Sequence, residues 1–192
     1  MICGIDNGLD GGIVIISATT GAIIAKRPMP TRWRHQNEIR PESTTKPKDL
    51  PKSKREVDVE VARDWITGAT GDNAMACQFV LEEPGGSKSV SAAKSMAASF
   101  HAVRALFEVK GWAWEAITPR RWQKVMLDKS FDNTKDAALD AVSKVWPDEM
   151  WQKNARCKVA HDGMVDAALI AIYTFVLSNE NARWIAKAHQ KI

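Results

Sequence analysis

Cysteine is scarce in this chain of 192 residues, which has only Cys3, Cys77 and Cys157. The three are odd in number and far apart, so the sequence predicts neither a disulfide framework nor a cysteine-type zinc site. The sequence also lacks an apolar run of transmembrane length, and its first residues lack the basic start and apolar core of a signal peptide. These absences predict a protein of a reducing compartment, the cytoplasm, with no membrane partner.

Internal repeats and low-complexity tracts are absent as well, so chain length is the main guide to domain organisation. A chain of 192 residues fits one domain, and a hydrophobic content of 45% with 26% charged residues is ordinary for a globular protein with a full core. We therefore expect a single domain over residues 1–192, with a basic loop insertion at about 28–55.

This expected insertion at 28–55 is where positive charge is concentrated. The formal net charge is +4, and between residues 26 and 55 ten basic residues face three acidic ones. Five prolines and the lack of an apolar period predict an extended segment, which is either a solvated loop or an arm that faces nucleic acid. Trp33 within it would either stack on exposed bases or fold back and hold the loop against the body.

The first candidate site residue is Asp6, at the end of a short apolar strand predicted over 2–6. Two further strands are expected at 11–17 and 20–26, so the chain begins with a meander. Glycines soon after Asp6 would let the backbone come close to whatever its carboxylate binds. Alone, this pattern also occurs in phosphate loops of actin-like ATPases and sugar kinases, and an Asp at a strand end can merely cap a turn.

The second candidate is Glu82, in the segment CQFVLEEPGG at 77–86, which predicts a central strand that ends in acid. Successive side chains of a strand point to opposite faces, so only one of Glu82 and Glu83 shares a face with Asp6. We choose Glu82, the other interpretation being that both are strand-end acids that face water.

The third acidic segment is HDGMVDAALIAIY at 161–173, which predicts a helix. Asp162 and Asp166 are four residues apart and so lie one turn above each other, beside an apolar stripe that must be buried. Two unpaired carboxylates at the edge of a core would be costly, and the segment holds no cation to neutralise them. A divalent metal fits better than Lys or Arg, because the other two acidic segments can converge on it.

Between and after these acids the sequence predicts further helices and one more strand. A basic cluster begins the short helix at PRRWQKVML, and Lys135 starts the next helix. The alternation of strands and helices indicates an α/β fold. The predicted segments are helices at 56–69, 88–110, 135–146 and 179–192 and a strand at 112–119.

The acidic segments, in this order and spacing, resemble one known family. The chain resembles RuvC-type Holliday junction resolvases of the ribonuclease H-like superfamily, and more closely the divergent versions carried by bacteriophages. GIDNGLDGG is similar to the family's first strand with its first catalytic Asp, FVLEEP to its second acidic strand, and HDGMVDAALIAIY to its terminal helix. TPRRWQKVML followed by TKDAALDAVSKVWP resembles the helical stretch that precedes the last acids in the phage proteins.

This resemblance implies a ribonuclease H-like fold with a mixed five-stranded sheet, its first three strands antiparallel, flanked by helices. It implies an enzyme, a crossover junction endodeoxyribonuclease of DNA recombination and repair that makes paired symmetric nicks and leaves 5′ phosphate and 3′ hydroxyl ends. Two Mg²⁺ ions per site, replaceable by Mn²⁺, would serve the hydrolysis. The implied partners are branched DNA and a second copy of the chain, in the host cytoplasm if a phage encodes the protein.

The implied catalytic and metal-binding residues are Asp6, Glu82, Asp162 and Asp166. Two features depart from the family: the last acids are more widely spaced than in the bacterial enzymes, and the loop at 28–55 is longer. The first makes His161 a substitute candidate for Asp162 that could bind metal or transfer a proton, although a His in the first turn is more often a helix cap or a surface residue. The candidate DNA-binding residues are Lys135, Lys124, Arg120, Arg121, Arg32 and Arg34.

Three other functions stay open on the sequence. A less specific nuclease that debranches forks and flaps would use the same acids, and a long basic arm would suit varied branches. An actin-like phosphate-binding ATPase is suggested by GIDNGLDGG alone, but it needs a second domain and a second phosphate loop. A catalytically silent DNA-binding homologue is disfavoured by the intact set of acids.

Overall fold

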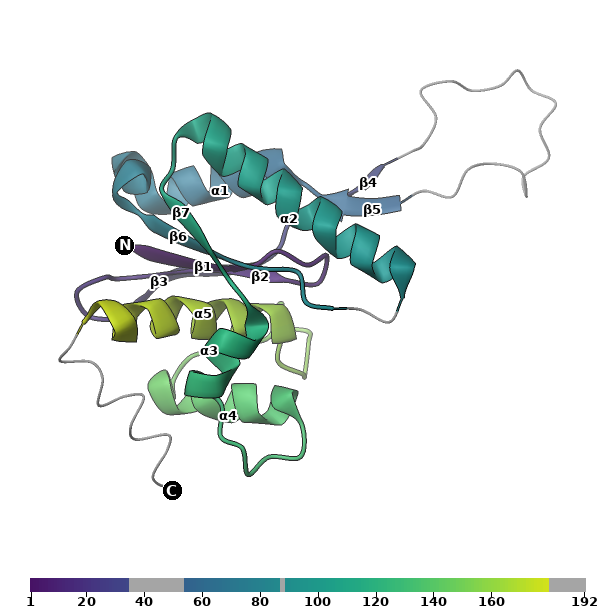
Figure 1. The fold of residues 1–192 in the computed structure, drawn as a ribbon. Helices are drawn as coiled ribbons and strands as arrows, with labels where there is room; N and C mark the ends of the chain where they lie inside the picture. Colours follow the sequence, from purple (N-terminus) through teal and green to yellow (C-terminus); the bar gives the residue numbers. More distant parts are fainter. Residues whose placement is uncertain (35–53, 87–88, 180–192) are drawn as a thin grey trace, which may run out of the picture.

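Five strands form a mixed sheet at the centre of the computed structural model (Figure 1). The structure describes residues 1–34, 54–86 and 89–179. Strand order is β3-β2-β1-β6-β7, in which β1, β2 and β3 are antiparallel and β6 and β7 run parallel to β1. The antiparallel start that we predicted is confirmed. The strands are β1 (Ile2–Asp6), β2 (Gly12–Ile16), β3 (Ile23–Pro28), β6 (Gln78–Glu82) and β7 (Trp114–Ile117).

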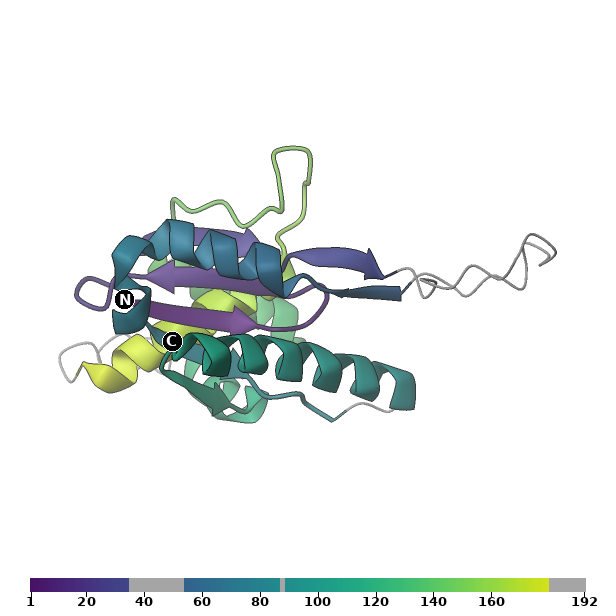
Figure 2. The same cartoon turned by 90° about the horizontal axis from the view of Figure 1, so that it is seen from above.

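Helices cover both faces of this sheet (Figures 1 and 2). One face packs against α5, with α3 and α4 outside it, and the other face packs against α1 and α2. Alternate residues of each strand therefore enter two separate cores, as the pleat requires. The helices are α1 (Val59–Thr70), the 3-10 helix η2 (Gly71–Ala76), α2 (Val90–Lys110), α3 (Pro119–Met126), α4 (Thr134–Val145) and α5 (Asp162–Ser178).

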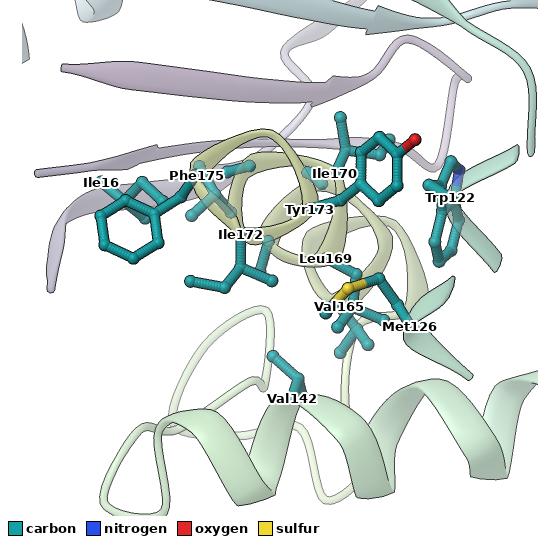
Figure 3. Packing of buried hydrophobic residues seen from close by; sticks show 14 of the residues in the cluster. Ile16, Trp122, Met126, Val142, Val165, Leu169, Ile170, Ile172, Tyr173 and Phe175 are labelled. Carbon is teal, nitrogen blue, oxygen red and sulfur yellow. The ribbon is translucent and has the colours of Figure 1, made fainter. Parts of the chain in front are cut away.

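Helix α5 is the central helix of the larger core (Figure 3). Every residue from Gly163 to Val176 is buried except Asp166, so the helix is enclosed on all sides. The prediction of a single apolar stripe was therefore too narrow. The sheet covers one side of α5, and side chains such as Met126 of α3 and Val142 of α4 cover the other.

Glycines allow α5 to lie almost directly on the sheet. A Cβ atom added at Gly4 of β1 would lie 2.1 Å from the carbonyl oxygen of Ala167. One added at Gly163 would lie 2.3 Å from the carbonyl oxygen of Asp10, in the turn between β1 and β2. Such distances are far shorter than van der Waals contact. The close packing of α5 on the sheet therefore requires glycine, which has no Cβ atom, at these positions.

Two further strands form a separate antiparallel pair, β4 (Thr31–Arg34) and β5 (Lys54–Val57). We expected the whole segment 28–55 to be an irregular insertion. The pairing of β4 with β5 shows instead that residues near both ends of this segment form strands. Cross-strand hydrogen bonding satisfies the backbone there without any apolar period in the sequence. Residues 35–53 lie outside the described part of the chain, as does the predicted terminal helix beyond Asn179.

None of the described helices is both long and apolar enough to cross a membrane.

Candidate acidic site at the sheet edge

Asp6 and Glu82 lie side by side where two parallel strands end. Ile5 of β1 is in register with Leu81 of β6, so the next residue of each strand reaches the same edge of the sheet. The buried amide of Asn7 donates a 2.5 Å hydrogen bond to the main-chain oxygen of Glu82, which ties the two strand ends together. Both predicted strand-end acids therefore belong to one location.

Helix α5 brings Asp166 to this edge. A bridge between Gly11 and Gly163 joins the first turn of α5 to the β1–β2 turn, and Asp166 follows within one helical turn. Asp6 and Asp166 are close enough that each raises the pKa of Glu82. The structure thus gathers Asp6, Glu82 and Asp166 from two strands and a helix.

Burial is the main reason that Glu82 holds its proton. Its pKa is raised to about 8, mostly by desolvation and in smaller part by the negative charges of Asp6 and Asp166, against a hydrogen bond that lowers it. That hydrogen bond comes from the indole Nε1 of Trp122 in α3, 2.8 Å from the carboxylate. Trp122 is fully buried, so its ring holds the Glu82 side chain in one direction.

The pKa values of the other two acids, Asp166 and Asp6, are also raised. The pKa of Asp166 is raised to about 7, mostly by burial and in smaller part by the charges of Asp6 and Asp162, while Lys135 lowers it. Burial also raises the pKa of Asp6, although the main-chain N–H of Gly8 donates a 3.0 Å hydrogen bond to its carboxylate. Three carboxylates that repel one another in a partly buried place are costly unless a cation joins them.

Asp162 is placed differently from these three acids. Its side chain is 51% exposed and forms an ion pair with Lys135 at the start of α4. It therefore lies at the rim of the site, where it still raises the pKa of Asp166. Lys135, which we predicted as a DNA contact, thus lies at the rim of the acidic site, where its charge lowers the pKa of Asp166.

His161 caps helix α5. Its Nδ1 accepts a hydrogen bond from the main-chain N–H of Met164 at 3.3 Å. Burial lowers the pKa of the imidazole, and the positive charge of Lys153 lowers it further. The prediction that His161 is a helix cap is therefore confirmed, because one of its ring nitrogens accepts a hydrogen bond from the first turn of α5.

The remaining predicted cations lie farther out. Arg120, Arg121 and Lys124 are exposed on α3, and the first and last of these line an open groove of about 530 Å³ between α3 and the start of α4. Arg32 lies on β4 and pairs with Glu56 at 2.9 Å. The backbone of Arg34 belongs to β4, but its side chain lies outside the described part of the structure.

Sequence reasoning missed Asn7 and Trp122. Asn7 directly follows β1, and its amide joins that strand to a residue 75 positions away in sequence. Trp122 is a buried aromatic residue that stands between polar residues in the helix PRRWQKVM, and that ring was the available signal. Both residues position an acid through partners that are distant in sequence.

The donor set fits a hard divalent cation in its chemistry. Carboxylate oxygens are the ligands that Mg²⁺ and Mn²⁺ prefer, and the mutual repulsion of Asp6, Glu82 and Asp166 would be relieved by such an ion. In their present orientations, the His, Cys, Asp and Glu side chains of the described residues do not form a group of three that could coordinate a metal ion. The hydrogen bonds from Gly8 and Trp122 hold two of the carboxylates in their present directions.

These pKa values predict how stability depends on pH without metal. Glu82 and Asp166 have pKa values of about 8 and about 7 in the folded protein, above their usual 4.5 and 3.8. At pH values between the usual and the raised pKa of each group, the folded state binds more protons than the unfolded state. Stability therefore falls as pH rises through this range. We expect urea unfolding in EDTA to show a free energy of unfolding lower by about 3 kcal/mol at pH 8.5 than at pH 5.

Glu82→Gln should remove most of this pH dependence, because it deletes the group with the larger shift. Added Mg²⁺ at pH 8.5 should restore stability to the unmodified chain. A stability that instead rises steadily from pH 5 to pH 8.5 in EDTA would show that the carboxylates do not crowd one another as described.

Known proteins share this fold although their sequences differ. No protein-family model matches the sequence, and no curated protein sequence matches it. The chain is structurally similar to Thermus thermophilus RuvC in complex with a Holliday junction substrate, at 12% identity and a TM-score of 0.51, over 92% of this chain and 94% of that one. Another structure of Thermus thermophilus RuvC is 15% identical over 92% and 95% of the two chains, with a TM-score of 0.49. The predicted ribonuclease H-like fold is therefore confirmed.

Proposed function

We propose that this protein is a metal-dependent endonuclease that cleaves branched DNA, with a four-way junction as its main substrate. The observation that carries the proposal is the convergence of Asp6, Glu82 and Asp166 at one sheet edge, within a fold shared with RuvC. Crowded, partly buried carboxylates with raised pKa values are typical of functional sites.

Asp6, Glu82 and Asp166 would bind Mg²⁺ or Mn²⁺ directly, and Asp162 would complete a site for a second ion. When bound, two such ions would supply the activation of a water and the stabilisation of the leaving 3′ oxygen of a phosphodiester. Asp162 lies at the exposed rim and is already paired with Lys135, so it is the most readily rearranged of the four acids.

The protein's own residues hold these ligands in place. Trp122 Nε1 directs one oxygen of Glu82, and the amide of Asn7 fixes the strand end that carries it. The N–H of Gly8 holds Asp6 in the same way from its own turn. Lys135, next to Asp162, is placed to attract a phosphate to the rim of the site.

DNA is the proposed substrate because positive charge lies beside the acidic edge. Lys135 adjoins the acids, and Arg120 and Lys124 line the neighbouring groove. A phosphodiester backbone would be attracted by these cations and presented to the carboxylates between them. A homodimer would offer two such sites to the two symmetric strands of a junction, and the structurally similar RuvC was itself solved with a Holliday junction substrate.

The proposal is tested by incubating the protein with a labelled immobile four-way junction, a replication fork and plain duplex, each with Mg²⁺ or EDTA. We expect paired symmetric nicks in the junction with Mg²⁺ and none with EDTA. Asp6→Asn should be inactive because it removes a metal-binding carboxylate at the sheet edge. Asp148→Asn, at an exposed position after the end of α4, is the matched control and should cut normally.

Each outcome separates the alternatives. Equal cutting of forks and junctions would favour the less specific debranching nuclease. Absence of metal-dependent cutting on all three substrates would overturn the nuclease proposal, and ATP binding would then direct attention to the phosphate-loop alternative.

A further inference from the structure

A hairpin at residues 152–160 lies directly before the acidic helix and takes no part in the site described above. A bridge between Gln152 and Ala160 closes its base. Just outside that bridge, the N–H of His161 donates a 2.7 Å hydrogen bond to the main-chain oxygen of Trp151. Because Trp151 is buried in the larger core, the base of this basic hairpin is fixed to the body of the protein.

The basic hairpin carries three exposed cations, Lys153, Arg156 and Lys158. It contains no Asp or Glu, and none of the three cations forms an ion pair with another residue in the described ranges. The side chain of Asn154 shapes the tip, where its Oδ1 accepts the N–H of Arg156 at 3.0 Å. The hairpin therefore presents positive charge that the described protein does not neutralise.

This charge lies next to the acidic site. The hairpin ends at Ala160, and the next residue, His161, caps α5, whose first turn carries Asp162. In Figure 2 the hairpin is the pale green loop at the top, on the opposite flank from α2. The basic hairpin thus borders the start of α5, and none of its residues lines the groove between α3 and α4.

We propose that the basic hairpin binds the phosphate backbone of a duplex arm of the DNA substrate, beside the acidic site. This inference rests on the proposed function and adds a second contact surface to it. Unpaired exposed cations gain most from neutralising phosphates, since they release condensed counterions and give up no existing partner. The hairpin has no aromatic residue on which an unpaired base could stack, so its chemistry favours duplex backbone over single strands.

The test is the salt dependence of DNA binding in EDTA, where no cutting occurs. The triple variant Lys153→Gln, Arg156→Gln and Lys158→Gln is compared with the unchanged protein by fluorescence anisotropy on a four-way junction, on duplex and on single strands. Loss of three phosphate contacts should reduce the slope of log K against log salt by about 2.7 on the junction and on duplex. The charge-preserving exchange of Lys for Arg and Arg for Lys at these positions should restore the slope.

A second triple variant controls for net charge. Arg63→Gln, Lys110→Gln and Lys144→Gln remove the same charge from α1 and from the last turns of α2 and α4, and should change the slope by less than about 1. Equal effects of the two triples, or an unchanged slope in the hairpin variant, would overturn the inference. A loss confined to single-stranded DNA would overturn the assignment to duplex.

Failure here is distinguishable from failure of the proposed function. Metal-dependent cutting together with an unchanged slope in the hairpin variant would refute only the proposed role of the hairpin in DNA binding. A reduced slope without any cutting in Mg²⁺ would leave a DNA-binding surface on a protein that is not a nuclease.

Discussion

Asp166→Asn is expected to lower the rate of junction cleavage by at least about a thousandfold, equivalent to about 4 kcal/mol of transition-state stabilisation. Asp166 is partly buried, and its pKa of about 7 reflects burial and its nearness to Asp6. An amide in its place keeps the shape of the side chain but loses the charge and most of the affinity for a hard cation. Single-turnover cleavage in Mg²⁺ measures the loss.

The same substitution should not harm the fold. Removing one of several carboxylates that repel one another relieves Asp6 and Glu82, so the metal-free variant should be more stable at pH 8, by about 1 kcal/mol. Added Mg²⁺ should raise the melting temperature of the unchanged protein more than that of the variant. A decrease in stability alongside the lost activity would mean that Asp166 is structural.

Asp162→Asn is the comparison that tests the order of importance among the acids. Asp162 is 51% exposed and already paired with Lys135, so its loss should cost about tenfold in rate. Normal cutting by Asp166→Asn in Mg²⁺ would refute the assignment of the site. An Asp162→Asn variant as inactive as Asp166→Asn would instead show that the rim acid is an equal partner.

The sequence was sufficient to find the acids because each one interrupts an apolar pattern. Asp6 and Glu82 both end short apolar strands that are followed by Gly or Pro, and Asp166 falls inside the apolar helix α5. Strand alternation predicted that only one of Glu82 and Glu83 shares a face with Asp6, and Glu82, which we chose, is the one whose carboxylate meets Trp122. Local pattern therefore selected acids that the fold brings together at one sheet edge.

What supports those acids was not predictable in the same way. The hydrogen bond from Asn7 spans 75 residues of sequence and that from Trp122 spans 40. Such contacts arise only when β1 and β6 pair in parallel and α3 packs beside them, and no local pattern encodes that pairing. The pairing of β4 with β5 was missed for the same reason, since the partners flank a long intervening segment.

The prediction for α5 was incomplete because alanine gives a weak signal. Three alanines, Ala167, Ala168 and Ala171, separate the large apolar residues of the helix, and alanines do not by themselves indicate a buried face. In the structure all three are fully buried. Their small size is what lets the helix approach the sheet, and the facing residue of β1 is a glycine.

Gly4→Ala is therefore expected to destabilise the protein by about 3 kcal/mol, although it adds a single methyl group. The new Cβ would lie 2.1 Å from the oxygen of Ala167 and 2.6 Å from the nitrogen of Ala171, both main-chain atoms of α5. Main chain cannot move aside as a flexible side chain can, so α5 must shift away from β1. Urea unfolding measures the change.

Gly68→Ala is the matched control, because the same methyl group meets nothing within 4 Å there. Gly68 lies within α1, where alanine is the better helix former, so this variant should be more stable by about 0.5 to 1 kcal/mol. The two substitutions are chemically identical and should act in opposite directions. Equal stability of the two variants would mean that α5 does not rest on β1 as closely as the structure shows.

The displacement of α5 has a consequence for the site as well. Asp166 is carried by the same helix, one position before Ala167, so any shift of α5 separates its carboxylate from Asp6. At a temperature where Gly4→Ala remains folded, we expect junction binding to persist while the cleavage rate falls by about tenfold or more. Full activity in a folded Gly4→Ala protein would show that the acids tolerate this movement, and that the distance between helix and sheet does not control the chemistry.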